Sequence, residues 1–302
     1  MSVILQATVI SKVYTLGRSG EYQALKDVSL TIEQGEFVSV MGPSGSGKSS
    51  LLYCVSGMDK VSSGSISFAG LELDQLTEKD LAELRLQKMG FVFQQGNLLR
   101  NLSIIDNIVL AAYMGGSLKR ADINQRAIEL MQKTGILDLK DKDISQVSGG
   151  QMQRAAICRA LINQPDMLFA DEPTGALNLA ATSEVMQILT TLNQEGMTIM
   201  LVTHDAKVAA RSTRVLFMQD GQIVGEFKQG PLTSQADLPE QDGQLEQADL
   251  LDQSDQRDQA DQPEQADLLP KTGQLDQAGL AQQSVLKARE NSLSEWLAEQ
   301  GF

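Results

Sequence analysis

Residues 2–41 alternate short apolar and β-branched runs with turn-forming glycine and polar clusters. The runs VILQATVI, VSLTI and EFVSVM are typical of strands separated by turns. The last run leads into the glycine-rich segment GPSGSGKSS, and the apolar run LLYCVSGM follows. The pattern therefore predicts several strands, a glycine-rich loop near residues 42–49, and then a helix.

The middle of the chain changes to helical periodicity, which extends from about residue 97 to 165 in runs such as ADINQRAIELMQKTGI and GGQMQRAAICRALI. Short apolar runs then return as MLFADE, TIMLVTHD, VLFMQDG and QIVGEF, and helical segments separate the first three. Near-continuous apolar strands are typical of a parallel sheet that is covered on both faces. We therefore predict an α/β core with an inserted helical subdomain at about 97–165.

The composition shifts after Lys228 to glutamine, aspartate, alanine and leucine, and eight hexads such as QADLPE and QADLLD run in register from Gln235 to Gln282. This stretch has almost no aromatic or β-branched residues, so it buries too little apolar area to offset the entropy of ordering. We expect residues 229–282 to be an acidic, disordered tail. The alternative is a repetitive solenoid or a strip that binds a partner.

The last residues, SLSEWLAEQGF, resume a helical pattern. Ser292 and Glu295 have the spacing of a capping box, and Leu293, Trp296 and Leu297 would share one face. We therefore expect a short amphipathic helix within 283–302 that docks on another surface.

Charge and cysteine content exclude several functions. The formal net charge is −14, but residues 229–302 hold 15 acidic and 4 basic residues, a net of −11, which leaves −3 for the rest. Without a basic surface we expect no binding to nucleic acid. The two cysteines, Cys54 and Cys158, are far apart in predicted helices and indicate neither a disulfide framework nor a metal site. No stretch approaches the roughly 18 to 20 apolar residues of a membrane span.

The segment from Gly42 to Ser49 fits the pattern G-x-x-x-x-G-K-[ST]. Glycines let backbone N–H groups converge on phosphate oxygens, the lysine reaches the β- and γ-phosphates, and the serine hydroxyl binds Mg²⁺. The following helix points its positive dipole end at the anion. We expect ATP to be bound by Gly42, Ser44, Gly45, Gly47, Lys48, Ser49 and Ser50.

The run MLFADE places Asp171 and Glu172 at the end of a predicted buried strand. An acid pair there also occurs as a simple strand cap, but beside a phosphate loop it indicates a P-loop NTPase. We expect Asp171 to bind Mg²⁺ together with Ser49, and Glu172 to be the catalytic base that polarises the attacking water.

The segment Val147-Ser148-Gly149-Gly150-Gln151 begins a predicted helix and resembles LSGGQ, the signature of the ABC ATPase family. The resemblance covers about residues 3–228 and implies a P-loop NTPase core with a mostly parallel sheet, an N-terminal antiparallel β region and an inserted helical subdomain. It also implies that Ser148, Gly149, Gly150 and Gln151 close over the γ-phosphate bound by a second copy of the chain. A homodimer would then form at the ATP sites.

Three further residues match positions of this family. Gln94 in GFVFQQ resembles the glutamine that senses Mg²⁺ and the attacking water, and we count it with the metal-binding and catalytic residues. His204 in LVTHD, the only histidine of the chain, resembles the switch histidine that contacts the γ-phosphate. Tyr14 matches the place where an aromatic ring stacks on adenine, although an ordinary tyrosine at a strand end would fit as well.

The resemblance implies an ATP hydrolase that uses ATP and Mg²⁺, lies on the cytoplasmic face of the cell membrane and drives a separate integral membrane permease. The segments GPSGSGKSSLL, GFVFQQGNLL and FADEPTGAL resemble those of one branch of the family. This branch contains lipoprotein-release, macrolide-export and antimicrobial-peptide resistance transporters. Export or extraction of such a substrate is therefore the expected function. The alternatives are a mechanical or signalling module with a membrane partner, and a soluble ATPase of DNA repair or ribosomes, which would carry long insertions or a second nucleotide domain.

Three positions depart from the family pattern. Val147 replaces leucine in an apolar position, and Ser50 replaces the commoner threonine, and we expect both changes to be tolerated. Asn178 stands where the loop GALN normally ends in aspartate. Because that aspartate communicates between the two sites of the dimer, we expect Asn178 to lower basal turnover.

Overall fold

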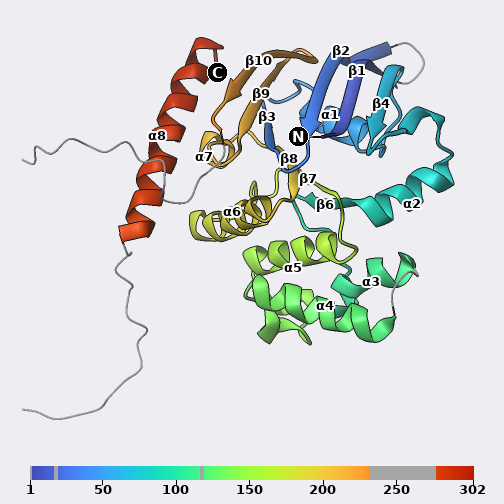
Figure 1. The fold of residues 1–302 in the computed structure, drawn as a ribbon, viewed down its shortest axis with the longest axis vertical. Coiled ribbons are helices and arrows are strands. Elements are labelled where there is room, and N and C mark those ends of the chain that lie inside the picture. Colours follow the sequence, from blue (N-terminus) through green and yellow to red (C-terminus); the bar gives the residue numbers. More distant parts are fainter. Residues whose placement is uncertain (1, 17–19, 116–118, 231–276) are drawn as a thin grey trace, which may run out of the picture. The chain divides into compact units, whose positions relative to one another are not determined.

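The structure is a computed structural model that describes residues 2–16, 20–115, 119–230 and 277–302 (Figure 1). The chain divides into two units, one of residues 1–232 with 286–302 and one of residues 233–285. Within the second unit the structure describes only 277–285, which are helical. The tail that we expected to be disordered comprises residues 229–282. Of these, residues 231–276 lie outside the described part of the chain.

The N-terminal strands form an antiparallel sheet with the order β2-β1-β4-β5. In β2 the side chains of Val28, Leu30 and Ile32 are buried while the intervening residues are exposed, so one face covers the core. The strands are β1 (Val3–Leu16), β2 (Gly20–Glu33), β4 (Ser63–Phe68) and β5 (Leu71–Glu72).

The second sheet has the order β10-β9-β3-β8-β7-β6, in which only β10 is antiparallel to its neighbour. Every residue of β3 and β8 is buried, because both faces of this sheet are covered. The strands are β3 (Phe37–Met41), β6 (Met89–Phe93), β7 (Met167–Asp171), β8 (Thr198–Val202), β9 (Arg214–Gln219) and β10 (Gln222–Lys228).

Helices surround this sheet and form a subdomain of their own. The described helices are α1 (Lys48–Val55), α2 (Glu78–Lys88), α3 (Ile104–Gly115), α4 (Arg120–Lys133), α5 (Gly149–Leu161), α6 (Leu179–Gln194), α7 (Ala206–Ala209) and α8 (Gln277–Glu299). The short 3₁₀ turns are Leu73–Gln75, Leu137–Leu139 and Ile144–Gln146.

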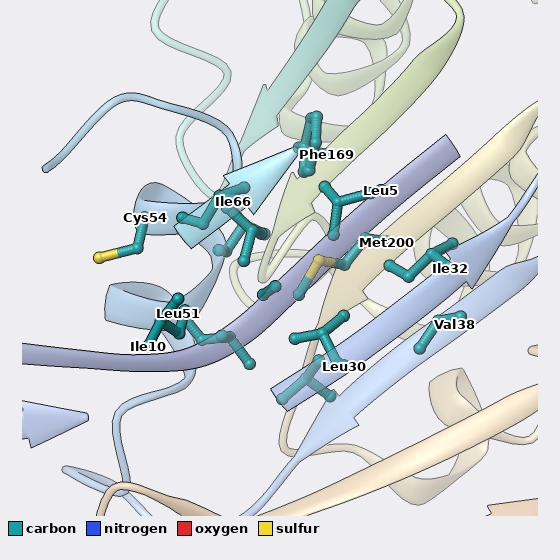
Figure 2. Packing of buried hydrophobic residues seen from close by; sticks show 14 of the residues in the cluster. Leu5, Ile10, Leu30, Ile32, Val38, Leu51, Cys54, Ile66, Phe169 and Met200 are labelled. Atoms are coloured by element: carbon teal, nitrogen blue, oxygen red, sulfur yellow. The ribbon is translucent and has the colours of Figure 1, made fainter. Parts of the chain in front are cut away.

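Separate apolar clusters stabilise these parts. The largest lies between the two sheets, where side chains of β1, β2 and β4 meet those of α1, β3, β7 and β8 (Figure 2). A second cluster packs α5 and α6 on the other face of the parallel sheet. A third, which includes Ile108, Met131 and Cys158, joins α3, α4 and α5. The predicted fold, an α/β cassette with an antiparallel N-terminal sheet and a mostly parallel sheet, is confirmed.

The C-terminal helix differs from the expectation. Helix α8 begins at Gln277, inside the last hexads, and continues through Ser292 and Glu295. The proposed capping box is therefore wrong, because Ser292 lies within the helix and not before it. Residues 277–290 contain many strong helix formers, such as alanine, leucine, glutamine, lysine and arginine, which explains the earlier start.

The order of the strands brings several predicted residues to one edge of the parallel sheet. Gly42 follows β3, Gln94 follows β6, Asp171 ends β7, and His204 lies two residues beyond β8. In sheets of this kind, ligands bind at the carboxyl ends of the strands. This edge is therefore the candidate site.

Candidate active site

The phosphate loop connects β3 to α1 and has a backbone that only glycine can adopt at two positions. Gly42 and Gly47 have φ angles of 145° and 101°. A Cβ atom would lie 2.0 Å from Met218 O at Gly42, and 2.5 Å from Ala24 O at Gly47. The loop is thus packed tightly against neighbouring backbone, while Ser44 and Gly45 remain exposed at its tip.

Lys48 is the first residue of α1 and is only 9% exposed. Its Nζ atom donates hydrogen bonds of 2.8 Å to Gly42 O and Pro43 O, so the ammonium group lies across the loop. Burial lowers the pKa of Lys48, while the nearby carboxylates of Glu172 and Asp171 raise it. This geometry places a cation where the loop can bind a phosphate.

Asp171, at the end of β7, is held from two sides by α1. Ser49 Oγ donates a hydrogen bond of 3.0 Å to its Oδ1 atom, and Tyr53 OH donates one of 2.7 Å to its Oδ2 atom. A hydroxyl and a carboxylate at this distance are ligands that Mg²⁺ prefers, together with phosphate oxygens. The residues present therefore fit a magnesium ion.

Glu172 and His204 lie within hydrogen-bond distance. His204 Nδ1 is 2.9 Å from Glu172 Oε1, and the Glu172 N–H group donates to Val202 O at 3.0 Å. The φ angle of Glu172 is 47°, which is unusual for a residue with a Cβ atom and is a form of strain that clusters at functional sites. The pair is well placed to orient a water molecule beside the phosphate loop.

Gln94 lies against the loop that follows Glu172. A Cβ atom on Gly175 would lie 2.8 Å from Gln94 Nε2, and Gly175 N donates to Glu172 O at 3.1 Å. The residues around Gln94 are bonded to α5, because Gln153 Nε2 donates to Phe93 O at 3.0 Å and the Arg159 guanidinium donates to Gly96 O at 2.6 Å. The segment around Gln94 thus lies between this edge of the parallel sheet and α5.

The signature residues lie at the N-terminus of α5, and Ser148 caps that helix. Ser148 Oγ accepts from Gln151 N at 3.3 Å, and Gln151 Oε1 accepts from Ser148 N at 2.8 Å. Gly150 is buried against α6, where a Cβ atom would lie 2.8 Å from Ala181 Cβ. Figure 1 shows α5 beside α3 and α4 and away from α1, so the structure does not bring the signature to the chain's own phosphate loop.

Comparison with known proteins identifies this arrangement. A family profile described as "ABC transporter" matches residues 25–175. The bacitracin export ATP-binding protein BceA of Halalkalibacterium halodurans is 41% identical over 233 residues, which cover 77% of this chain and 91% of that protein. The chain belongs to the ABC transporter ATP-binding family.

Other members of the ABC family extend this result. The macrolide export ATP-binding/permease protein MacB of Chlorobaculum tepidum is 40% identical over 78% of this chain, but the match spans only 36% of MacB. The dimeric structure of the bacterial ABC transporter cassette MJ0796 has a TM-score of 0.70 and 38% identity, and its post-hydrolysis form with ADP and Pi has a TM-score of 0.69. These matches cover 74% of this chain and 98% of MJ0796. The protein is thus an ABC cassette that binds and hydrolyses ATP.

Tyr14 lies beside helix α1 of this ABC cassette, within reach of Ser50 and Asp59. Its hydroxyl donates to Asp59 Oδ2 at 2.8 Å, and Lys12 Nζ lies 4.8 Å from its ring centroid. Lys12 Nζ also donates to Asp59 Oδ1 at 2.6 Å. Burial raises the pKa of Tyr14, a hydrogen bond with Ser50 lowers it, and Asp59 raises it. Tyr14 is thus oriented from the side of α1.

Three residues of this site were missed by the sequence analysis: Lys12, Tyr53 and Asp59. Lys12 is two positions before Tyr14 on the same strand, so period-two spacing would have found it. Tyr53 follows Ser49 by four residues on α1, which places both on one helical face. Asp59 carried no such signal, because its contacts with β1 depend on how the chain folds back after α1.

Asn178 has a local role in the structure. It is the N-cap of α6, and its Oδ1 atom accepts a hydrogen bond of 2.9 Å from Ala181 N. Aspartate would cap this helix in the same way. The departure from the family pattern therefore changes the charge of this loop and not its fold.

Proposed function

We propose that two copies of this chain bind two ATP molecules head to tail and drive a separate membrane permease from the cytoplasmic face of the membrane. The substrate class would be a lipoprotein, a macrolide or a peptide-like molecule that is exported or extracted. The similarity to BceA and MacB, whose names include bacitracin export and macrolide export, supports this class. Among the residues that the structure describes, none of the helices has both the length and the apolar character of a membrane span.

The observation that carries the proposal is the Glu172–His204 pair at 2.9 Å, near Lys48 at the start of α1. Glu172 accepts a proton from the attacking water, and His204 orients Glu172 and contacts the γ-phosphate. Lys48 and the loop N–H groups bind the phosphates, and Tyr14 stacks on adenine.

A magnesium ion would be held by Ser49 and Asp171, with Gln94 close to it. Bound there, Mg²⁺ would neutralise charge on the β- and γ-phosphates. Ser148, Gly149, Gly150 and Gln151 of the second copy would close the site from the other side. The exposed N-terminus of α5 supports this role, because a helix N-terminus binds anions.

The permease would dock in an apolar groove next to Gln94. This cavity of about 360 Å³ is formed by α2, β6, α3 and α5, and its apolar lining includes Leu86, Phe91, Phe93 and Ala111. We assign it to a short helix of the permease with an apolar face. Contact there would reach Gln94 through Phe93, the residue that precedes it, and would couple the movement of the permease to ATP turnover.

The Glu172→Gln variant tests the catalytic assignment. Because glutamine does not accept the proton, we expect turnover to fall by about a hundredfold or more, while ATP binding remains and stabilises a dimer. ATPase assays and size-exclusion chromatography with ATP measure the two properties. Glu83→Gln, an exposed glutamate on α2, is the matched control. Hydrolysis by Glu172→Gln at the parental rate would contradict the assignment.

The trapped Glu172→Gln dimer also tests the transport role. We expect a polytopic membrane protein to co-purify with it from gently solubilised membranes, and mass spectrometry would identify that protein. Transport of a substrate by the reconstituted complex would distinguish a transporter from a mechanical or signalling module. Recovery of soluble proteins only would contradict the permease assignment.

A further inference from the structure

Helix α8 is docked on the ATPase domain. Within the first unit of the chain, residues 286–302 pack on β9, β10 and α7. These contacts define the surface that α8 binds and the parts of the ATPase domain that it touches.

The apolar part of this contact is fully buried. Leu293 and Leu297 are 0% and 3% exposed, and they share one cluster with residues of the ATPase domain. The other buried members of that cluster are Met41, Ala209, Ala210, Val215 and Phe217. Small alanines of α7 leave space for the two leucines, so the surface fits an amphipathic helix.

Aromatic rings fix the orientation of α8. Trp296 stacks on Phe227 with ring centroids 5.3 Å apart, and its edge meets Phe217 at 6.2 Å. Gly225 of β10 leaves room for the indole, because a Cβ atom there would lie 2.8 Å from Trp296 Cζ2. The surface that binds α8 therefore requires a residue without a side chain at position 225.

A partly buried arginine, Arg289, completes the contact. The Arg289 guanidinium donates to Ser212 O at 2.6 Å, to Gly230 O at 3.0 Å and to Gln229 Oε1 at 3.2 Å. All of these acceptors are neutral oxygens, and burial lowers the pKa of Arg289 to about 10. These bonds connect α8 to the turn after α7 and to the end of β10.

The surface that binds α8 adjoins the catalytic edge at two places. Met41 directly precedes Gly42, the first glycine of the phosphate loop. Helix α7 begins at Ala206, and its N-cap, Asp205, directly follows His204. Because α8 packs on Ala206, Ala209 and Ala210, it contacts α7. His204, the switch histidine, lies two residues before this short helix.

We propose that the docked helix α8 holds α7 in the position at which His204 meets Glu172. ATP turnover therefore depends on the docking of α8. The partner of the β9–β10–α7 surface is thus this chain's own C-terminal helix. The inference rests on the proposed role of His204. It makes α8 a positioning element, because it touches neither the nucleotide nor the reacting atoms.

Docking is measured through Trp296, the only tryptophan of the 302 residues. In the unaltered chain we expect blue-shifted indole emission and weak quenching by acrylamide, because the ring is held between Phe227 and Phe217. Gly225→Ala inserts a methyl group where the indole lies, at a φ angle that alanine adopts without strain. The emission should shift to the red and quenching should increase.

A second variant acts on the helix instead of its docking surface. Leu293→Asn places an amide in the buried cluster, and Ser292→Asn introduces the same side chain at the neighbouring exposed position as a control. Val224→Ala, at an exposed position of β10, is the control for Gly225→Ala. Both controls should keep the parental emission and turnover.

Turnover decides whether docking has a catalytic effect. We expect kcat to fall at least about fivefold in Gly225→Ala and in Leu293→Asn, which is the lower end of typical coupling between sites, while affinity for a fluorescent ATP analogue stays unchanged. A merely structural role would lower the midpoint of thermal unfolding and leave kcat unaltered well below that temperature. Red-shifted emission with parental kcat, or unshifted emission in both variants, would overturn the proposal. Parental turnover in His204→Ala would instead contradict the role of His204.

Discussion

The phosphate-loop end and the signature end of this ABC cassette satisfy their polar groups in different ways. Lys48 is buried and bonded to loop carbonyls, and both oxygens of Asp171 accept hydrogen bonds from α1. Ser148 is exposed, and within the described part of the chain its side chain and that of Gln151 bond to the start of their own helix. The polar groups of the phosphate-loop end are thus bonded within a single chain. The signature end exposes the N-terminus of α5 to solvent.

This difference explains why a dimer would be needed for turnover. A buried lysine and an acid pair offer a cation and metal ligands from one chain, whereas an exposed helix N-terminus stabilises an anion only when a second molecule supplies one. The following predictions separate the two ends, from the largest expected effect to the smallest.

The largest effect is expected when each end is damaged in a different copy. Lys48→Met removes the phosphate-binding cation, and Ser148→Arg blocks the signature, so each variant alone should lose nearly all turnover. In an equal mixture, about half of the dimers would contain one intact site, because an undamaged loop then faces an undamaged signature. ATPase assays of the mixture should show recovered activity. A mixture as inactive as its components would contradict head-to-tail sites.

The groove proposed for the permease is the next test. Ala82→Arg would place a long charged side chain at an exposed position in its lining. We expect co-purification of the permease to fall by about tenfold or more, since a buried unpaired charge costs several kcal/mol, while ATP binding is unchanged. Ala121→Arg, on an exposed position of α4, is the matched control. Equal loss in both variants would show that the effect is not specific to the groove.

Tyr53→Phe tests the phosphate-loop end alone. The variant keeps the ring but leaves Asp171 Oδ2 without the hydrogen bond of 2.7 Å. We expect Mg²⁺ affinity to fall by about tenfold, because residues that orient metal ligands typically have effects of this size. Titration of Mn²⁺ binding by electron paramagnetic resonance measures this without turnover. Tyr113→Phe, which removes a hydroxyl bonded to Asn124 in the helical part, should have no effect.

The smallest effect is expected at Asn178, between the signature helix and the catalytic edge. Asn178→Asp keeps the cap of α6 and adds a negative charge at a helix N-terminus, which stabilises it by about 0.3 to 1 kcal/mol. If asparagine weakens communication across the dimer, turnover should rise by roughly twofold to threefold, within the same energy range. An unchanged ATPase rate would argue against that role for Asn178.

Local motifs allowed much of the fold and the reaction to be predicted. The strand–loop–helix pattern at residues 42–49 and the two acids at the end of β7 depend on neighbouring residues, which hydrophobic periodicity and glycine content reveal directly. Period-two and period-3.6 patterns separated the strands from the helical subdomain for the same reason. The start of α8 was not found, because the hexads hid the helix formers that precede Ser292.

Contacts between distant segments could not be predicted in this way. Tyr53 and Asp171 are 118 residues apart, and Lys12 and Asp59 are 47 apart, yet both pairs are hydrogen-bonded. The apolar pattern of α8 indicated a docking face, but nothing in the pattern pointed to Phe217 and Phe227 as its partners.

The sequence by itself determined the class of this protein, because the phosphate loop and the signature are contiguous segments whose chemistry follows from residue types and spacing. Only the tertiary structure decided how Glu172 meets His204, how Asp171 is held by α1, and which surface α8 covers. These contacts arise when strands far apart in the chain pair in one sheet, so their distances depend on the packing of the whole domain and not on any local pattern.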